Sequence, residues 1–160
     1  MKIFDSSPLI AILGELNQPK LLEHTISLGY SLYAPFAVVN EISKNPTKEN
    51  LLKMINNKQI TNLEPVNKEE MQNFRNRFYR LGLGESELIL VAQKWKAENK
   101  NFCCIIDDQV ARKISESLNL KCKGTIAILK KLSEQGLISL QEVEIMFKTL
   151  DKSGFRYKFK

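Results

Sequence analysis

Aspartates stand at two points where short apolar segments of the sequence end. Asp5 closes the apolar start of the chain, and the pair Asp107 and Asp108 follows the apolar run at 102–106. An aspartate ahead of a helix ordinarily caps it, and Asp5 or one member of the later pair can fill that role. A second carboxylate beside Asp5 would repel it unless the two share a proton or a cation. A hard divalent metal with oxygen ligands would resolve that conflict.

Glutamates at three further positions could join these aspartates. Glu41 lies in the apolar helical segment 36–42, where the ordinary alternative is an exposed place on the polar face. Glu85 and Glu87 lie at the start of a helix whose dipole favours both. Residues two apart point to different sides of a helix, so one of them faces a site more easily than the other. Glu85 shares its side with Ile89, which indicates an inward direction, whereas Glu87 suits a capping role.

The segments that must position these acids alternate between short apolar strands and amphipathic helices. Strands are expected at 2–5, 31–34, 59–63, 102–107 and 120–122. Strands joined by helical crossovers lie parallel and are covered by helices on both faces. The fold class is therefore α/β, a three-layer α/β/α sandwich around a mostly parallel sheet. Its site is expected beyond the carboxyl ends of the strands, where strand order reverses.

Helix boundaries have their own signals. Prolines 19 and 35 fit first-turn positions, and Asn67 with Glu70 and Ser139 with Glu142 have the spacing of capping boxes. Four glycines fit positions just past helix ends, namely Gly29, Gly82, Gly136 and Gly154.

Length and composition predict one soluble domain over residues 1–160. The chain has 160 residues, 43% of them hydrophobic, which is enough to bury a core. Three cysteines without a CxxC spacing argue against a disulfide framework and a zinc ribbon. No leader-like or membrane-spanning apolar run is visible, so we expect a cytoplasmic protein that does not insert in a membrane.

The charge is positive and unevenly distributed. Lys and Arg number 24 against 18 Asp and Glu, for a net charge of +6. Residues 121–160 hold nine cations and four acids, so +5 of that charge lies there. This asymmetry is compatible with a polyanionic partner, although a solvated helical face is the ordinary explanation.

Several function classes lack their residues. His24 is the only histidine, and it lies on the polar side of a helical pattern, which disfavours histidine-dependent catalysis. No GxxxxGK[ST] loop or GxGxxG turn is present to cradle a nucleotide phosphate. A phosphorylation-switched signalling domain would carry its acidic pair after the first strand, whereas here the pair falls late, at Asp107.

The joint order of these motifs resembles the PIN-domain nucleases, and within them a subfamily of small prokaryotic proteins. The matching segments are 5–9, 39–42, 84–87, 107–112, 124–125 and 154–156, so the resemblance spans almost the whole chain. It implies a PIN-like α/β/α fold that hydrolyses RNA phosphodiesters with Mg²⁺ or Mn²⁺. Phosphodiester hydrolysis by bound metal suits carboxylates, because they hold hard cations and leave positions open for water and phosphate.

The resemblance also assigns roles to individual residues. The four catalytic acids are Asp5, Glu41, Glu85 and Asp107, and the metal ligands are drawn from Asp5, Glu85, Asp107 and Asp108. Residues that support the acids are Ser6, Glu87 and Thr125. From the charge pattern, the candidates for RNA contact are Arg112, Lys121, Lys123, Lys130, Arg156 and Lys158.

The resemblance further implies a toxin-like role, in which a small antitoxin protein blocks the acidic cleft, and a tendency to form homodimers. The alternative is a non-catalytic module that binds RNA or an antitoxin on the same fold.

Overall fold

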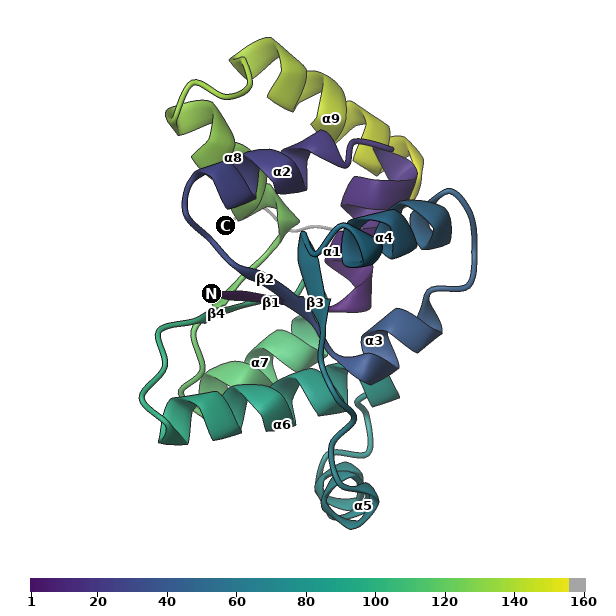
Figure 1. Cartoon of the computed structure of the whole chain (residues 1–160), viewed down its shortest axis with the longest axis vertical. Coiled ribbons are helices and arrows are strands. Elements are labelled where there is room, and N and C mark those ends of the chain that lie inside the picture. Colours follow the sequence, from purple (N-terminus) through teal and green to yellow (C-terminus); the bar gives the residue numbers. More distant parts are fainter. Residues whose placement is uncertain (156–160) are drawn as a thin grey trace.

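Five short parallel strands form the centre of the molecule (Figure 1). We describe residues 1–155 of a computed structural model. The strands are β1 (Lys2–Phe4), β2 (Leu32–Ala34), β3 (Ile60–Asn62), β4 (Cys103–Ile105) and β5 (Cys122–Lys123), in the order β3-β2-β1-β4-β5. Every neighbouring pair is parallel, which confirms the expected sheet.

The last strand begins later than its sequence predicts. We expected it at 120–122, but the amide of Leu120 donates a hydrogen bond to the Ser115 carbonyl at 2.9 Å. Leu120 therefore closes the preceding helix and is buried there, and the sheet pairing starts only with the following residues.

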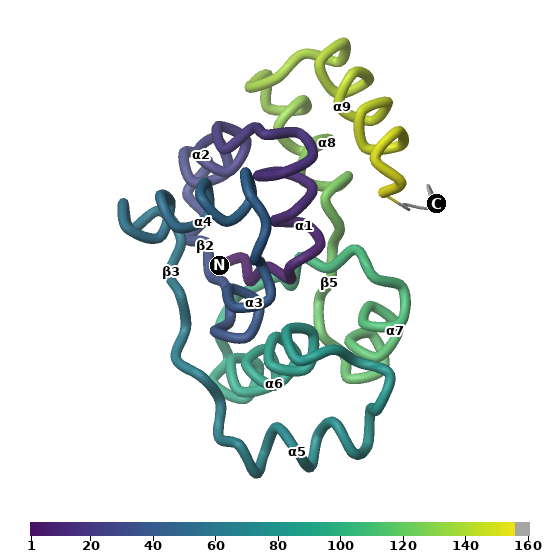
Figure 2. The backbone as a smooth tube through the Cα atoms, turned by 90° about the vertical axis from the view of Figure 1, so that its right-hand side faces the viewer, coloured from purple at the N-terminus to yellow at the C-terminus, as the bar shows by residue number. Residues whose placement is uncertain are grey.

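Helices cover both faces of the sheet, as a three-layer α/β/α sandwich requires. They are α1 (Ser6–Ile10) with a π-helical continuation at Ala11–Glu15, α2 (Lys20–Ser27), α3 (Phe36–Glu41), α4 (Thr47–Asn56), α5 (Lys68–Arg77), α6 (Leu83–Ala97), α7 (Gln109–Ser117), α8 (Thr125–Glu134) and α9 (Leu140–Lys152). Figure 1 shows α1, α2, α4, α8 and α9 on one side of the sheet and α6 and α7 on the other. In Figure 2, α5 lies beyond α6, away from the sheet.

Two apolar cores sandwich the sheet because successive strand residues point to opposite faces. Phe4 packs with the core under α1, α2, α8 and α9, whereas Ile3 packs with the core under α6 and α7. Both side chains are fully buried. Burial of an aliphatic or aromatic side chain of this size contributes about 1.5–3 kcal/mol, so both faces hold β1 in place.

Most predicted helix ends are confirmed. Ser139 and Glu142 form a capping box, and the Asn67 side chain accepts hydrogen bonds from the amides of Glu69 and Glu70. The prediction for Gly82 is wrong, because this glycine stands at the N-cap of α6, after the end of α5 at Arg77. No helix in the described range is long and apolar enough to cross a membrane.

Candidate active site

The carboxyl ends of β1 and β4 form the point where strand order reverses. The chain runs outward from β1 through β2 to β3, then returns to pair β4 with the other side of β1. Phe4 and Ile105 are register partners, and the Asp5 amide donates to the Ile105 carbonyl at 3.0 Å. Crevices outside the carboxyl ends at such a point are the usual ligand sites of open parallel sheets. Asp5 and Asp107 follow these two strands.

Asp5 is a buried carboxylate without a hydrogen-bond partner. Its side chain is 1% exposed, and neither carboxylate oxygen finds a partner within residues 1–155. It stands at the N-cap position of α1 but makes no side-chain capping bond, so the ordinary capping interpretation fails. Burial, followed by the nearby charge of Glu85 and more weakly that of Glu41, raises the pKa of Asp5 to about 7, while the backbone amides of Ser6 and Ser7 oppose the rise. Neither amide reaches hydrogen-bond geometry, so charged Asp5 has less compensation than buried carboxylates normally have.

Glu41 is held at the end of α3 by the start of α6. Its Oε1 accepts a hydrogen bond from the Gly84 amide at 2.8 Å. A Cβ atom at position 84 would lie 2.5 Å from Glu41 Oε2 and 3.0 Å from Val38 Cγ2. Glycine at position 84 therefore allows α6 to approach the carboxylate closely.

Glu85 extends from the first turn of α6. Its Oε2 accepts a hydrogen bond from the Gly82 amide at 2.9 Å. The pKa of Glu85 is raised by burial, although the Gly82 hydrogen bond opposes the rise, and the charges of Asp108 and Glu41 add to it. Asp5, Glu41 and Glu85 thus form one electrostatically coupled group, which Asp108 joins through Glu85.

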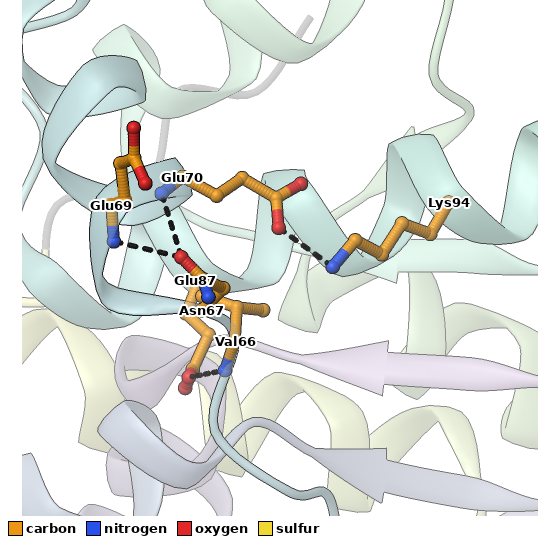
Figure 3. A network of polar contacts seen from close by, with 6 residues as sticks. All are labelled: Val66, Asn67, Glu69, Glu70, Glu87 and Lys94. Atoms are coloured by element: carbon orange, nitrogen blue, oxygen red, sulfur yellow. Dashed lines mark hydrogen bonds and ion pairs between the residues drawn. The ribbon is translucent and has the colours of Figure 1, made fainter.

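Glu87 makes hydrogen bonds away from this group. It is 2% exposed; its Oε2 accepts from the Ala37 amide at 2.5 Å and its Oε1 from the Val66 amide at 3.0 Å. Figure 3 shows the bond to Val66 beside Asn67, which caps α5. Because Ala37 lies in the first turn of α3, Glu87 caps the helix that carries Glu41 and ties it to the connection after β3.

Asp107 is bound to the start of α8. Its Oδ1 accepts from the Thr125 amide at 2.8 Å and its Oδ2 from the Thr125 hydroxyl at 2.5 Å. Burial raises the pKa of Asp107, while the Thr125 bonds and the charge of Arg112 oppose the rise. A Cβ atom at Gly124 would lie 2.6 Å from Asp107 Oδ1 and 3.6 Å from an Arg112 nitrogen. Asp107, Thr125 and Arg112 therefore meet at a glycine that leaves them room.

Asp108 and Ser6 have local places. Asp108 Oδ1 accepts from the amides of Val110 and Ala111 at 2.8 and 2.9 Å, so Asp108 is the cap of α7. Ser6 opens α1 directly after Asp5, but its hydroxyl does not hydrogen-bond the Asp5 carboxylate, whose oxygens have no partner in the described chain.

The predicted RNA-contact residues do not gather in one place. Arg112 lies beside Asp107. Lys121, Lys123 and Lys130 instead line a pocket with Lys2 that none of the predicted catalytic acids lines. Lys123 alone lies at a carboxyl strand end, where it pairs with Ile105. Sequence placed these lysines close together in the chain but could not say which end of the sheet they occupy. Arg156 and Lys158 lie outside the described residues.

Comparison with protein families decides the assignment. A family model described as a PIN domain matches residues 1–160. The chain belongs to the PIN-domain family. PIN domains are generally nucleases and typically use divalent metals. Searches of curated proteins and of solved structures returned no match.

The acids of this PIN domain fit a divalent cation in part. Within the described range, no group of three or more acid, histidine or cysteine side chains is already arranged to hold a metal. Four of the acids accept a hydrogen bond from a backbone amide with at least one carboxylate oxygen, namely Glu41, Glu85, Asp107 and Asp108. Both oxygens of Asp5 remain unbonded and buried beside Glu41 and Glu85. A hard cation with oxygen ligands would supply the missing partner of Asp5 and offset the repulsion.

Two glycines of the PIN domain position the acids and were not predicted as site residues. The absence of a side chain at Gly84 leaves space for the Glu41 carboxylate, and its absence at Gly124 leaves space for Asp107 and Arg112. The signal in the sequence was their place immediately before Glu85 and Thr125, at the starts of two helices. Glycine at such a place also fits an ordinary N-cap, so its steric function appears only when the partner helix is known.

Proposed function

We propose that this PIN domain is an endoribonuclease that hydrolyses RNA phosphodiester bonds with Mg²⁺ or Mn²⁺ held by its carboxylates. The observation that carries the proposal is Asp5, a buried acid with two unbonded oxygens next to Glu41 and Glu85. An isolated buried carboxylate is expensive unless a proton or cation compensates it. Retaining such a group at the switch point of the sheet favours a metal site over a purely structural role.

In this proposal Asp5 is the principal metal ligand, and Glu85 and Asp107 are the other ligands. Asp108 and Glu41 lie near enough for their charges to act on Glu85, so they could contribute to metal binding. The bound metal would activate water and offset charge on the phosphate. Glu87 does not bind the metal but fixes the start of α3, the helix that carries Glu41. Thr125 fixes the orientation of the Asp107 carboxylate. Asp5 releases its proton when metal binds, because its pKa of about 7 leaves it partly protonated at neutral pH.

Arg112 is a cation beside the acids that could contact an RNA phosphate. It lies next to Asp107 at Gly124, and its charge opposes the rise in the pKa of Asp107 that burial causes. A guanidinium beside a carboxylate site offers the donors that a phosphate requires. We assign the RNA contact at this site to Arg112 in place of Lys121, Lys123 and Lys130.

A toxin role, with an antitoxin covering the crevice, extends the same proposal. Apolar side chains are exposed on helices that start near the acids, namely Ile10 at 38%, Phe36 at 41%, Leu83 at 48% and Val110 at 36%. Exposed apolar groups around a polar site suit a protein partner. The same observation supports the alternative of a non-catalytic module that binds an antitoxin or RNA. A homodimer would use such a surface equally well.

The test is cleavage of a defined single-stranded RNA with Mn²⁺, with and without chelator. We expect metal-dependent cleavage by the unchanged chain and loss of at least a hundredfold in rate for Asp5→Asn. Asp151→Asn is the matched control, because Asp151 is exposed on α9 and the change is the same. A single-stranded DNA of the same sequence tests the choice of substrate. Metal binding without cleavage of either strand would favour the non-catalytic alternative.

A further inference from the structure

A pocket of about 480 Å³ lies under α2 and α8, on one face of the sheet. It extends from the beginnings of β1 and β4 to Ile105 and Lys123, where β4 and β5 end. Figure 1 marks the N-terminus where β1 begins, whereas α1 and α3 start at the opposite end of the sheet. Its volume lies within the ~300–1,000 Å³ of ordinary small-molecule sites.

Lysines dominate the lining of this pocket. Five of them contribute, from β1, from β5 and its approach, and from α8: Lys2, Lys121, Lys123, Lys130 and Lys131. Glu134 is the one acid among the described lining residues, and it lies 3.9 Å from Lys131. The pocket therefore carries a strong excess of positive charge.

Three of the lysines lack an acidic counterpart. None of the ion pairs between described residues involves Lys2, Lys121 or Lys123. Burial lowers the pKa of Lys2, and the charges of Lys121 and Lys123 lower it further, while Cys103 opposes the change. These cations repel one another, so an anion that entered the pocket would relieve their repulsion.

One aromatic ring lies beside the lysines. Tyr30 lines the pocket, and the Lys2 ammonium lies 4.1 Å from the centre of its ring. Phe102 also borders the pocket, but its ring packs against Trp95 of α6 on the other face of the sheet. Aromatic rings next to cations suit a nucleotide, since a base stacks on a ring while its phosphate meets the positive charge. Inorganic phosphate has no base, so it could not stack on the Tyr30 ring.

We propose that this pocket binds a nucleotide through its phosphate, either as a free mononucleotide or as the phosphorylated end of an RNA strand. Lys2, Lys121 and Lys123 meet the phosphate, and Tyr30 faces the base. None of the acids after β1 and β4 lines this pocket, so nucleotide binding there does not depend on their being catalytic. Its loss would leave metal binding by Asp5 unchanged.

The experiment measures binding in the metal-free Asp5→Asn background, where RNA stays intact. The probes are adenosine monophosphate, inorganic phosphate, and one short RNA with either a 5′-phosphate or a 5′-hydroxyl end. The pocket variant combines Lys2→Gln, Lys121→Gln and Lys123→Gln. The control combines Lys48→Gln, Lys68→Gln and Lys152→Gln, which removes the same charge at exposed positions outside the pocket lining.

We expect the pocket variant to bind its nucleotide at least tenfold more weakly, and the control to bind it as the parent does. Binding of adenosine monophosphate identifies a free nucleotide as the ligand, and preference for the 5′-phosphate RNA without it identifies the strand end. Either result supports the proposal. Equal binding of both RNAs with no binding of adenosine monophosphate would overturn it, and so would equal losses in the two triple variants. Binding of inorganic phosphate as tightly as adenosine monophosphate would exclude the aromatic contact and overturn the nucleotide assignment.

Lys121 and Lys123 are exposed, so their replacement does not open the core. The single change Lys123→Gln provides a second variant in case the triple one fails to fold. We expect it to weaken nucleotide binding several-fold, and unchanged affinity for every probe would contradict the proposal.

Discussion

The Asp5 side chain combines deep burial with two unbonded oxygens. A charged carboxylate in that setting costs free energy, and the neighbouring Glu85 and Glu41 increase the cost. The metal-free protein therefore favours the protonated form of Asp5 more than an unfolded chain would. Replacing Asp5 should therefore change both the metal affinity and the pH dependence of the free energy of unfolding.

The first prediction concerns the stability of the metal-free protein. The pKa of Asp5 rises from 3.8 to about 7 on folding, so the folded state binds the proton more tightly. The stability that Asp5 contributes is full below pH 3.8 and is lost as pH rises through about 7. Asp5→Asn should raise the free energy of unfolding at pH 8 by up to about 4 kcal/mol, an upper bound at 1.36 kcal/mol per pKa unit.

Urea unfolding with chelator, followed from pH 4 to pH 8, measures this difference. The gap between Asp5→Asn and the unchanged chain should widen as pH rises. A gap independent of pH would show that the charge on Asp5 is already compensated.

The second prediction separates the two glutamates of α6. Glu85→Gln should remove most RNA cleavage with little loss of stability, because Glu85 lies with the acids and a glutamine oxygen can still accept the Gly82 hydrogen bond. Glu87→Gln should keep a substantial part of the activity but lose about 1–3 kcal/mol of stability, since one of the two part-buried amides that Glu87 binds would then face an NH₂ group. Rate and urea midpoint are measured on both variants. Equal activity losses at equal stability would contradict the separation.

The approach of α3 to α6 sets where Glu41 lies. At the end of α3, Glu41 accepts a hydrogen bond from the Gly84 amide. At its start, the Ala37 amide donates a hydrogen bond to Glu87. A short helix of six residues depends on such tertiary contacts, because isolated helices of this length are not stable. The position of Glu41 is thus a property of two packed helices.

The third prediction tests that packing with Gly84→Ala. Alanine favours a helix by about 1 kcal/mol over glycine, but its Cβ would lie 2.5 Å from Glu41 Oε2. We expect Glu41 to be displaced and RNA cleavage to fall at least tenfold. Gly82→Ala is the control, since its Cβ would meet nothing closer than 3.7 Å. Full activity of Gly84→Ala would show that Glu41 need not occupy this place.

Sequence patterns predicted the elements better than their contacts. Apolar runs and capping residues gave the strands and the starts of α5 and α9, because those signals are local. The bonds from Asp107 to Thr125 and from Glu87 to Ala37 join residues 18 and 50 positions apart, and no local pattern reveals them. Leu120 was predicted to begin a strand because it is apolar, but an apolar residue is buried equally well at the end of a helix.

Acids and lysines gather at different places on the molecule. The acids follow the ends of β1 and β4, whereas five lysines line the pocket under α2 and α8. The excess of +5 in residues 121–160 therefore does not simply surround the acids. A polyanion held at the lysine pocket and at Arg112 would span the molecule, with the metal offsetting repulsion at the acids.

The fourth prediction follows from this distribution. In the Asp5→Asn background with Mn²⁺, Arg112→Gln should weaken binding of single-stranded RNA and reduce the steepness of its salt dependence by ~0.7 per lost phosphate contact. Arg77→Gln, on exposed α5, should leave both unchanged. Binding across a salt series measures the slope, and identical slopes for the two variants would remove Arg112 from the RNA path.

Titration of the metal-free protein with Mn²⁺ at pH 8, followed by calorimetry, tests the carboxylate site most directly. The unchanged chain and Asp151→Asn should bind Mn²⁺ with the same affinity, and Asp5→Asn should bind it at least tenfold more weakly, because it loses the buried acid whose two oxygens are unbonded. Equal affinity of Asp5→Asn and the unchanged chain, or no binding by either, would contradict the assignment of Asp5 as the principal ligand.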